Sequence, residues 1–180
     1  MIPIALDPTR LRLGLAGRGP LLRRRLDLLG RGGATPALFS NDAEAVAGWP
    51  LASPLEAVAT ATLDVLWIAG LPDGEAAALA RAARSRGALV NVEDVRTQCD
   101  FHSVAEVRRG DLLLTVSTGG RSPALTARLR ADLARRFGPE WEERLHMLAQ
   151  HRDAWRRQGM DLSTLARRSD AVIDAAGWLS

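Results

Sequence analysis

Residues 11–30 read LRLGLAGRGPLLRRRLDLLG, and this stretch decides the fold. Arginine alternates with apolar residues and an apolar run follows up to Ala16, which is typical of a first strand. Gly17-Arg18-Gly19 comes next, and Pro20 stands where a helix can begin, because the first helical residue needs no N–H partner. Leu21–Leu29 then has the pattern of a helix that ends in a glycine-rich stretch. The sequence therefore predicts a strand, a tight turn and a helix, the first unit of an α/β fold.

The alternation of strands and helices continues along the chain. An alanine-rich helix is expected at Gly74–Arg86, and further strands are expected at Ala34–Ser40, Leu63–Ala69, Ala88–Val92 and Asp111–Val116. Strands that alternate with helices imply a parallel sheet with helices on both faces. From Ser122-Pro123 onward the pattern is helical, with helices expected up to Phe137, at Glu140–Arg157 and at Leu162–Ala176. The predicted fold class is α/β, a Rossmann-like parallel sheet followed by helices.

Composition narrows the class of protein. The chain has 180 residues, of which 47% are hydrophobic, enough for a real core. It contains no apolar run of the ~18 residues that span a membrane. The N-terminus lacks the order of a signal peptide, and the single Cys99 forms no internal disulfide, so we expect a cytoplasmic protein. All 24 basic side chains are arginine. They fit either solvated helix faces or a polyanionic ligand, but no pattern typical of nucleic-acid binding accompanies them.

The glycine turn is the first candidate site. Gly17-x-Gly19 begins a dinucleotide fingerprint, in which the first glycine permits a tight turn and the second lets a pyrophosphate approach the helix N-terminus. Leu22 stands where a third small residue is usual. Ser40, Asn41 and Asp42 follow the second predicted strand, and Asp42 comes 23 residues after Gly19, near the spacing of an acid that binds ribose. An ordinary strand-to-helix turn is the alternative.

The second candidate site is Asn91-Val92-Glu93-Asp94, where a predicted buried strand ends in two acids. Ligands of open parallel sheets bind beyond the carboxyl ends of the strands, so Asp94 is placed to meet a ligand. A cap for the following loop is the alternative.

The third candidate site is Ser117-Thr118-Gly119-Gly120-Arg121-Ser122, between a predicted strand and a predicted helix. Its hydroxyls, its freely turning backbone and the unpaired N–H groups of the helix N-terminus together favour an anion site, and Arg121 adds a charge. The alternative is a simple loop with an N-cap. The histidines predict no metal site, because His146 and His151 diverge on their helix.

Residues 91–94 (NVED), 99–101 (CDF) and 108–130 (RRGDLLLTVSTGGRSPALTARLR) carry a family resemblance. Together with the glycine turn, they resemble the bifunctional precorrin-2 dehydrogenase/sirohydrochlorin ferrochelatase family of sirohaem synthesis. In that family a glycine turn, an N-V-x-D strand end and an S-[ST]-G-G-x-S-P turn follow in this order. The resemblance extends over roughly residues 5–140 and is most specific from Asn91 to Arg130.

The resemblance implies three parts and one reaction. The parts are a Rossmann-like NAD-binding domain at residues 1–115, a dimerisation and substrate element at 116–140, and a helical domain at 141–180. The reaction is the NAD-dependent oxidation of precorrin-2 to sirohydrochlorin in a homodimer, with or without iron insertion. Asp94 would be the catalytic group and residues 117–122 would bind the tetrapyrrole. The residues expected to bind NAD are Gly17, Gly19, Pro20, Leu21, Asn41, Asp42, Gly70 and Leu71.

Three positions depart from the family pattern. Leu22 replaces a small residue, residues 70–73 (GLPD) replace a Thr-Asp loop beside the cofactor, and residues 102–104 (HSV) replace an apolar-then-proline step. The first two concern NAD binding, and the third concerns the substrate. An alternative function is therefore a tetrapyrrole-binding or chelatase protein of the same fold that no longer uses NAD. A third reading is an unrelated Rossmann-like module for another nucleotide.

Overall fold

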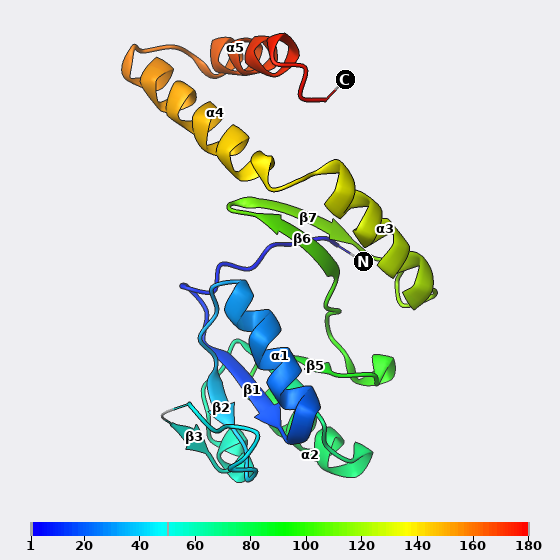
Figure 1. The fold of residues 1–180 in the computed structure, drawn as a ribbon. Coiled ribbons are helices and arrows are strands. Elements are labelled where there is room, and N and C mark those ends of the chain that lie inside the picture. The colour runs from blue at the N-terminus through cyan, green and yellow to red at the C-terminus, as the bar shows by residue number, and fades with distance from the viewer. Residues whose placement is uncertain (1, 50, 180) are drawn as a thin grey trace. The chain divides into compact units, whose positions relative to one another are not determined.

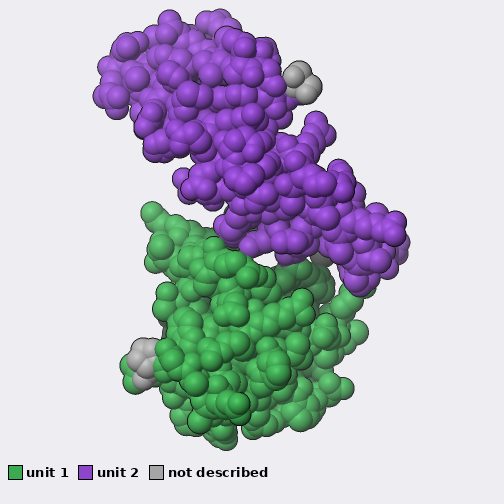
Figure 2. Space-filling view, viewed as in Figure 1, with its two compact units in different colours: residues 1–103 green, residues 104–180 purple. Residues whose placement is uncertain are grey.

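The computed structural model describes residues 2–49 and 51–179. The chain divides into two compact units, residues 1–103 and residues 104–180 (Figure 2). Each unit has its own secondary structure and its own internal packing, and each is described separately below.

The first unit is built on a parallel five-stranded sheet (Figure 1). Its strands lie in the order β3-β2-β1-β4-β5, which is the strand order of one half of a Rossmann fold together with two strands of the other. Every residue of β1 and β4 is buried, as expected for parallel strands covered on both faces. The bounds are Leu13–Gly17 for β1, Ala37–Phe39 for β2, Ala52–Ser53 for β3, Val65–Ala69 for β4 and Leu89–Val92 for β5.

Helices pack on opposite faces of this sheet. Helix α1 (Gly19–Arg31) buries Leu22 and Leu26 in one apolar cluster, and helix α2 (Asp73–Arg84) contributes alanines to another. Alternate strand residues point to the two clusters, so Trp67 belongs to the α1 side and Ile68 to the α2 side. The short 3₁₀ helices η1 (Leu55–Ala59) and η2 (Arg96–Gln98) complete the unit.

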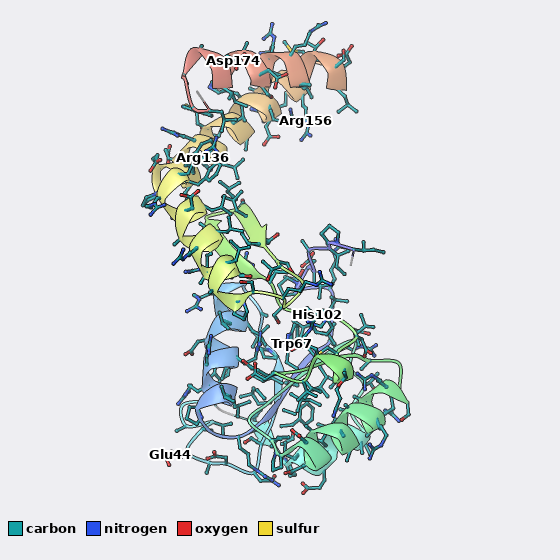
Figure 3. All side chains as sticks on the ribbon, turned by 90° about the vertical axis from the view of Figure 1, so that its right-hand side faces the viewer. Glu44, Trp67, His102, Arg136, Arg156 and Asp174 are labelled. Carbon is teal, nitrogen blue, oxygen red and sulfur yellow. The ribbon has the colours of Figure 1, made fainter. Side chains whose placement is uncertain are left out.

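The outer edge of β5 is covered by the segment that follows it. The Asp100 backbone N–H donates to the Val90 carbonyl at 2.8 Å, and the Val90 N–H donates to Asp100 Oδ2 at 2.8 Å. Cys99 Sγ accepts from the Val92 N–H at 3.3 Å and lies 3.1 Å from the Val92 carbonyl oxygen, to which it donates. Asn91 Nδ2 donates to the Phe101 carbonyl at 2.8 Å, and the Phe101 ring meets the ring of Trp67 edge to face. Trp67 is labelled in Figure 3.

The second unit consists of a β-hairpin and three helices. Strands β6 (Ala105–Arg109) and β7 (Leu112–Val116) pair antiparallel, with Val107 opposite Leu114. Helix α3 (Pro123–Arg136) packs on this hairpin, and Arg109 of β6 donates to the Ala134 and Phe137 carbonyls. Helices α4 (Glu140–Arg157) and α5 (Leu162–Ala175) pack against each other.

The structure confirms the Rossmann-like α/β class but corrects one strand. The strand expected at Asp111–Val116 forms at Leu112–Val116, yet it pairs with β6 in a hairpin and not with the parallel sheet. Its apolar run resembles that of a buried parallel strand, whereas β6 is charged and was not predicted. No strand follows residue 123 among the described residues, as expected, and α4 has the predicted bounds. No described helix is long and apolar enough to cross a membrane.

Candidate functional site

The carboxyl ends of β1, β4 and β5 lie side by side at one edge of the parallel sheet. Gly17 of β1 is opposite Ala69 of β4, and Val92 of β5 is opposite Ile68. This edge therefore brings together the glycine turn after β1, the Gly70 turn after β4 and the acidic turn at Asp94. It is the edge where open α/β sheets bind ligands.

Two glycines allow the first two turns to touch. A Cβ atom on Gly17 would overlap the Ala69 carbonyl oxygen, and one on Gly70, whose φ is +70°, would overlap the Arg18 carbonyl oxygen. The Arg18 N–H donates to the Ala69 carbonyl at 3.2 Å. Any side chain at either glycine would force the turns apart. Gly17 and Gly70, which lie far apart in the sequence, are thus part of two turns in direct contact.

Gly19 differs from both, because its missing side chain faces open space. Its φ is +64°, and a Cβ built on it would meet no heavy atom within 4 Å. The first N–H groups of a helix have no partner inside the helix. At α1, Arg18 bonds Ala69, Gly19 bonds Asp42 and Pro20 has no N–H, so among the described residues Leu21 supplies the amide that remains for a ligand. The turn has room and a donor for an anion.

Asp42 lies at this turn. Its carboxylate accepts from the Gly19 N–H at 2.9 Å and from the Ala45 N–H at 3.0 Å. These backbone donors, Ala45 first, lower the pKa of Asp42 below its usual value of 3.8. Ser40 Oγ donates to the Gly17 carbonyl at 2.7 Å and accepts from the Asp42 N–H, which fixes the loop after β2 to the glycine turn.

The Asn41 side chain points to the start of η1 and, among the described residues, makes no hydrogen bond with the glycine turn. Its Oδ1 accepts from the Leu55 N–H at 3.1 Å, and its Nδ2 donates to Glu56, so its side chain serves the start of η1.

Arg18 and Glu75 form an ion pair beside the glycine turn. Nη1 and Nη2 of Arg18 lie 3.0 and 2.8 Å from the two carboxylate oxygens of Glu75, which belongs to the first turn of α2. Both side chains are a third or more exposed. Sequence reasoning did not single out this pair, because its members are 57 residues apart and carry no motif.

The apolar residues of the cofactor prediction separate by role. Leu22 is fully buried in the α1-side cluster, so its size fills the core and leaves the turn unobstructed. Leu71 packs against the α2-side cluster, whereas Pro20 and Leu21 are exposed at the start of α1. The departure at Leu22 is accommodated by packing.

Asp94 follows β5 in a left-handed conformation with φ +64°, and it is the one non-glycine residue of the described chain with a positive φ. Such conformations cost on the order of 1 kcal/mol and occur preferentially at active sites and ligand clamps. Asp94 is exposed, and within the described residues its carboxylate makes no hydrogen bond or ion pair. Glu93, just before it, is bound to Arg25 of α1. Within the described residues, the Asp94 carboxylate is therefore exposed and has no partner.

The hydroxyls of residues 117–122 hold their own loop together. Ser117 Oγ accepts from the Gly119 N–H at 3.1 Å, Thr118 Oγ1 contacts Ser122 and Thr126, and Ser122 Oγ caps α3 by accepting from the Leu125 N–H at 3.2 Å. Gly119 and Gly120 have φ of +62° and +73°, which suits glycine. The exposed Arg121 side chain makes no hydrogen bond or ion pair within residues 2–49 and 51–179. The loop is preformed and leaves Arg121 available.

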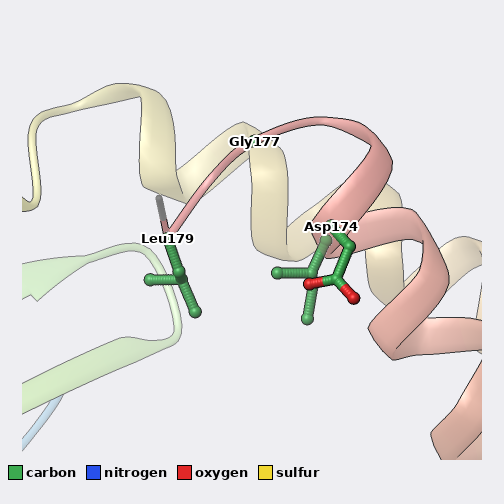
Figure 4. A pocket seen from close by; sticks show the side chains of 4 residues that line it. Asp174, Gly177 and Leu179 are labelled. Carbon is green, nitrogen blue, oxygen red and sulfur yellow. The ribbon is translucent and has the colours of Figure 1, made fainter.

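A shallow hollow of about 210 Å³ lies at the end of α5, lined by Ile173, Asp174, Gly177 and Leu179 (Figure 4). None of the predicted site residues lines it. The described residues contain no group of three or more His, Cys, Asp or Glu side chains that could hold a metal ion.

Comparisons with known proteins identify the families that this chain resembles. Residues 4–105 match the family model described as "Putative NAD(P)-binding", and residues 109–136 match that of "Sirohaem biosynthesis protein central". Siroheme synthase 1 of Pectobacterium atrosepticum is 30% identical over 178 residues, covering 87% of this chain and 37% of that protein. Siroheme synthase of Methylococcus capsulatus is 36% identical over 140 residues, covering 73% and 30%. The chain thus spans about a third of the length of these relatives.

Among solved structures, "SirC, precorrin-2 dehydrogenase" superposes with a TM-score of 0.74 and 21% identity, over 100% of this chain and 93% of that one. It has the same fold. The resemblance to the sirohaem-synthesis family is confirmed by these matches. Because the first family model spans more than half of the residues, this chain belongs to the family described as "Putative NAD(P)-binding".

Proposed function

We propose that this chain catalyses the NAD-dependent oxidation of precorrin-2 to sirohydrochlorin in sirohaem biosynthesis. One observation carries the proposal: an open glycine turn and an unpaired, left-handed Asp94 lie at the same carboxyl edge of a Rossmann-ordered sheet. The names of the related proteins support the choice of substrate.

The residues of the glycine turn fit a dinucleotide. The open space at Gly19 and the Leu21 amide suit a pyrophosphate, and the close contact of Gly17 and Gly70 with neighbouring backbone keeps the turn tight. Asp42, which is bound to the Gly19 N–H, would accept from a ribose hydroxyl and would repel a 2′-phosphate, which would favour NAD over NADP. When bound, NAD would supply the hydride acceptor for the reaction.

Asp94 would supply the base. Oxidation of precorrin-2 removes one hydride, which passes to NAD, and one proton, which needs an acceptor. An exposed carboxylate without a partner can accept that proton when the substrate lies within hydrogen-bond reach. The same carboxylate could accept pyrrole protons during iron insertion, so a ferrochelatase activity is part of the proposal's scope.

Residues 117–122 would bind the substrate's carboxylates. Precorrin-2 is a polyanion, and the preformed loop offers backbone donors and the unpaired guanidinium of Arg121. We further propose that the protein is a homodimer and that it is cytoplasmic. The homodimer is supported by helix α3, which buries none of its residues within the chain and whose Leu125 and Leu129 are 48% and 42% exposed.

Replacing Asp94 by asparagine tests the proposal. Asparagine tolerates the left-handed conformation, so we expect the thermal melting temperature and NAD binding to stay near those of the parent. Loss of a positioned base should slow NADH formation from precorrin-2 by about 100- to 10,000-fold, or about 2.7–5.4 kcal/mol. Equal rates in the two proteins would remove Asp94 from the mechanism. A lower melting temperature with a proportionate loss of rate would make its role structural.

A second candidate is a tetrapyrrole-binding or chelatase protein that does not use NAD. The observation in its favour is that the Gly19 amide already has a carboxylate partner in Asp42. Separate calorimetric titrations with NAD and with a porphyrin distinguish the two. The dehydrogenase binds both ligands, whereas the second candidate binds only the tetrapyrrole. A third protein class, an unrelated Rossmann-like module for another nucleotide, would bind only a nucleotide and no porphyrin.

A further inference from the structure

Arg25 forms a nearly buried ion pair with Glu93, and neither residue has a role in the proposed reaction described above. Arg25 lies on α1, where its side chain is 11% exposed and that of Glu93 is 12% exposed. Nε and Nη2 of Arg25 lie 3.3 Å from Oε2 of Glu93, and Nη1 donates to Ser103 Oγ at 2.8 Å. One guanidinium therefore joins the helix after the glycine turn to the end of β5 and to the last residue of the first unit.

The partner of this guanidinium directly precedes Asp94. The Glu93 N–H donates to the Ile68 carbonyl at 2.9 Å, and the Val95 N–H donates to the Val92 carbonyl at 3.2 Å. The backbone is thus fixed on both sides of Asp94, and the Glu93 side chain adds an anchor to a different element. A residue with φ of +64° needs such constraints, because L residues rarely adopt this conformation unaided.

The pair also sets the charge beside Asp94. Glu93 brings a negative charge next to the proposed base, and Arg25 neutralises it at contact distance. Little water screens the two groups, since about nine-tenths of each side chain is buried. The other ionisable side chains of the segment after β5 are those of Arg96, Cys99, His102 and Asp100, and Asp100 is paired with Arg84. On the adjacent β1 and β4 turns, Arg18 and Glu75 are bound to each other.

We propose that Arg25 and Glu93 are positioning residues for Asp94: their ion pair holds the turn after β5 and keeps the charge beside the base balanced. The proposal rests on the role of Asp94 proposed above. It adds to the reaction one residue of α1 and the residue that directly follows β5, neither of which needs to touch substrate or cofactor. Through this pair, Arg25 also links α1, the helix after the glycine turn, to the turn that holds Asp94.

The test follows the titration of the Asp94 side-chain carboxyl by ¹³C NMR in the full chain. Glu93→Gln leaves the positive charge of Arg25 uncompensated, so the Asp94 midpoint should fall. Arg25→Gln leaves the negative charge of Glu93 uncompensated, so the midpoint should rise. Each shift should be about half a pH unit for a nearby, partly screened unit charge. The double variant removes both charges and should return close to the parent.

Two control variants accompany these. Ser103→Ala removes only the neutral contact of Arg25 and should leave the Asp94 midpoint unchanged. Arg12→Gln breaks another ion pair, with Asp64, which precedes β4 at the opposite end of the strand. It should change neither the midpoint nor the rate of NADH formation.

The kinetic measurement separates this inference from the proposed function. In an active parent, the acid limb of the kcat profile should move with the Asp94 midpoint, in opposite directions for the two single variants. If the Asp94 midpoint does not change in the two single variants, or changes in the same direction in both, the positioning role is overturned. If the parent forms no NADH, the proposed function fails while the NMR titration still decides the inference. If a single variant does not fold, Glu93→Asp and Arg25→Lys keep the charges and alter the geometry. They should lower kcat without moving the midpoint, and an unchanged kcat would overturn the role.

Discussion

Alanine should have different effects at the two glycines of the turn. Gly19→Ala should mainly weaken NAD binding, whereas Gly17→Ala should mainly destabilise the fold. Gly19→Ala places a Cβ where no heavy atom lies within 4 Å, so its cost to stability is that of a left-handed alanine, roughly 1–2 kcal/mol. In a chain of this size, that lowers the melting temperature by about 2–8 °C. A bound pyrophosphate would occupy the same space, so NAD affinity should fall by at least about 100-fold, or ~2.8 kcal/mol.

Gly17→Ala is the matched variant. Its Cβ would overlap the Ala69 carbonyl oxygen, so strands β1 and β4 must shift, at a cost of about 3 kcal/mol. Melting curves measure the two stabilities, and calorimetric titration with NAD measures the affinities. A Gly19→Ala protein that binds NAD within about threefold of the parent would refute the assignment of the open space to the pyrophosphate. A Gly17→Ala protein as stable as the parent would refute the close contact of the turns.

Three further predictions follow from charge and exposure. Arg12 lowers the pKa of Asp64 to about 2 through side-chain and backbone hydrogen bonds, so their contribution to stability is present above pH 4 and lost as pH falls toward 2. The melting-temperature difference between the parent and Asp64→Asn should therefore vanish across that window, and a constant difference would contradict it. Asp42→Asn removes the charge that would repel a 2′-phosphate, so the NAD-to-NADP affinity ratio should fall about tenfold by calorimetry; an unchanged ratio would place Asp42 away from the ribose. The double variant Leu125→Glu with Leu129→Glu should be monomeric by light scattering if α3 forms the dimer interface, and a monomeric parent would count against the homodimer itself.

The sequence was informative where a local pattern decides local structure. The glycine turn, the helix at residues 140–157 and the buried strand around Trp67 could be predicted, because each depends on periodicity, caps or turn residues within a short stretch. Strand β7 was assigned to the wrong sheet for the same reason. Its apolar run is what a buried parallel strand would show, and pairing depends on the charged β6. The Gly110-Asp111 turn between them, with Gly110 at φ +55°, is the signal that could have indicated a hairpin.

The site was predictable in its backbone and much less in its side-chain pairs. Gly17, Gly19 and Asp94 stand at strand ends, so topology alone brings them to one edge. The Arg25–Glu93 pair joins residues 68 positions apart, and the choice of partner depends on how α1 packs on the sheet. Asn41 is the opposite example. It lies at the predicted position in the sequence, but its side chain accepts a hydrogen bond from Leu55 at the start of η1, which no sequence motif indicates.

The segment that covers the edge of β5 affects whether another chain can add a strand to the sheet. An outer strand normally presents unpaired N–H and C=O groups that template the addition of another chain's strand. Here the outward groups of Val90 and Val92 are already bound by Asp100 and Cys99. This flank of the sheet therefore offers an incoming strand no ladder to extend. The thiol supplies the two contacts at Val92, so an oxidation of Cys99 that broke them would uncover the Val92 N–H and C=O groups, while Asp100 would still cover those of Val90.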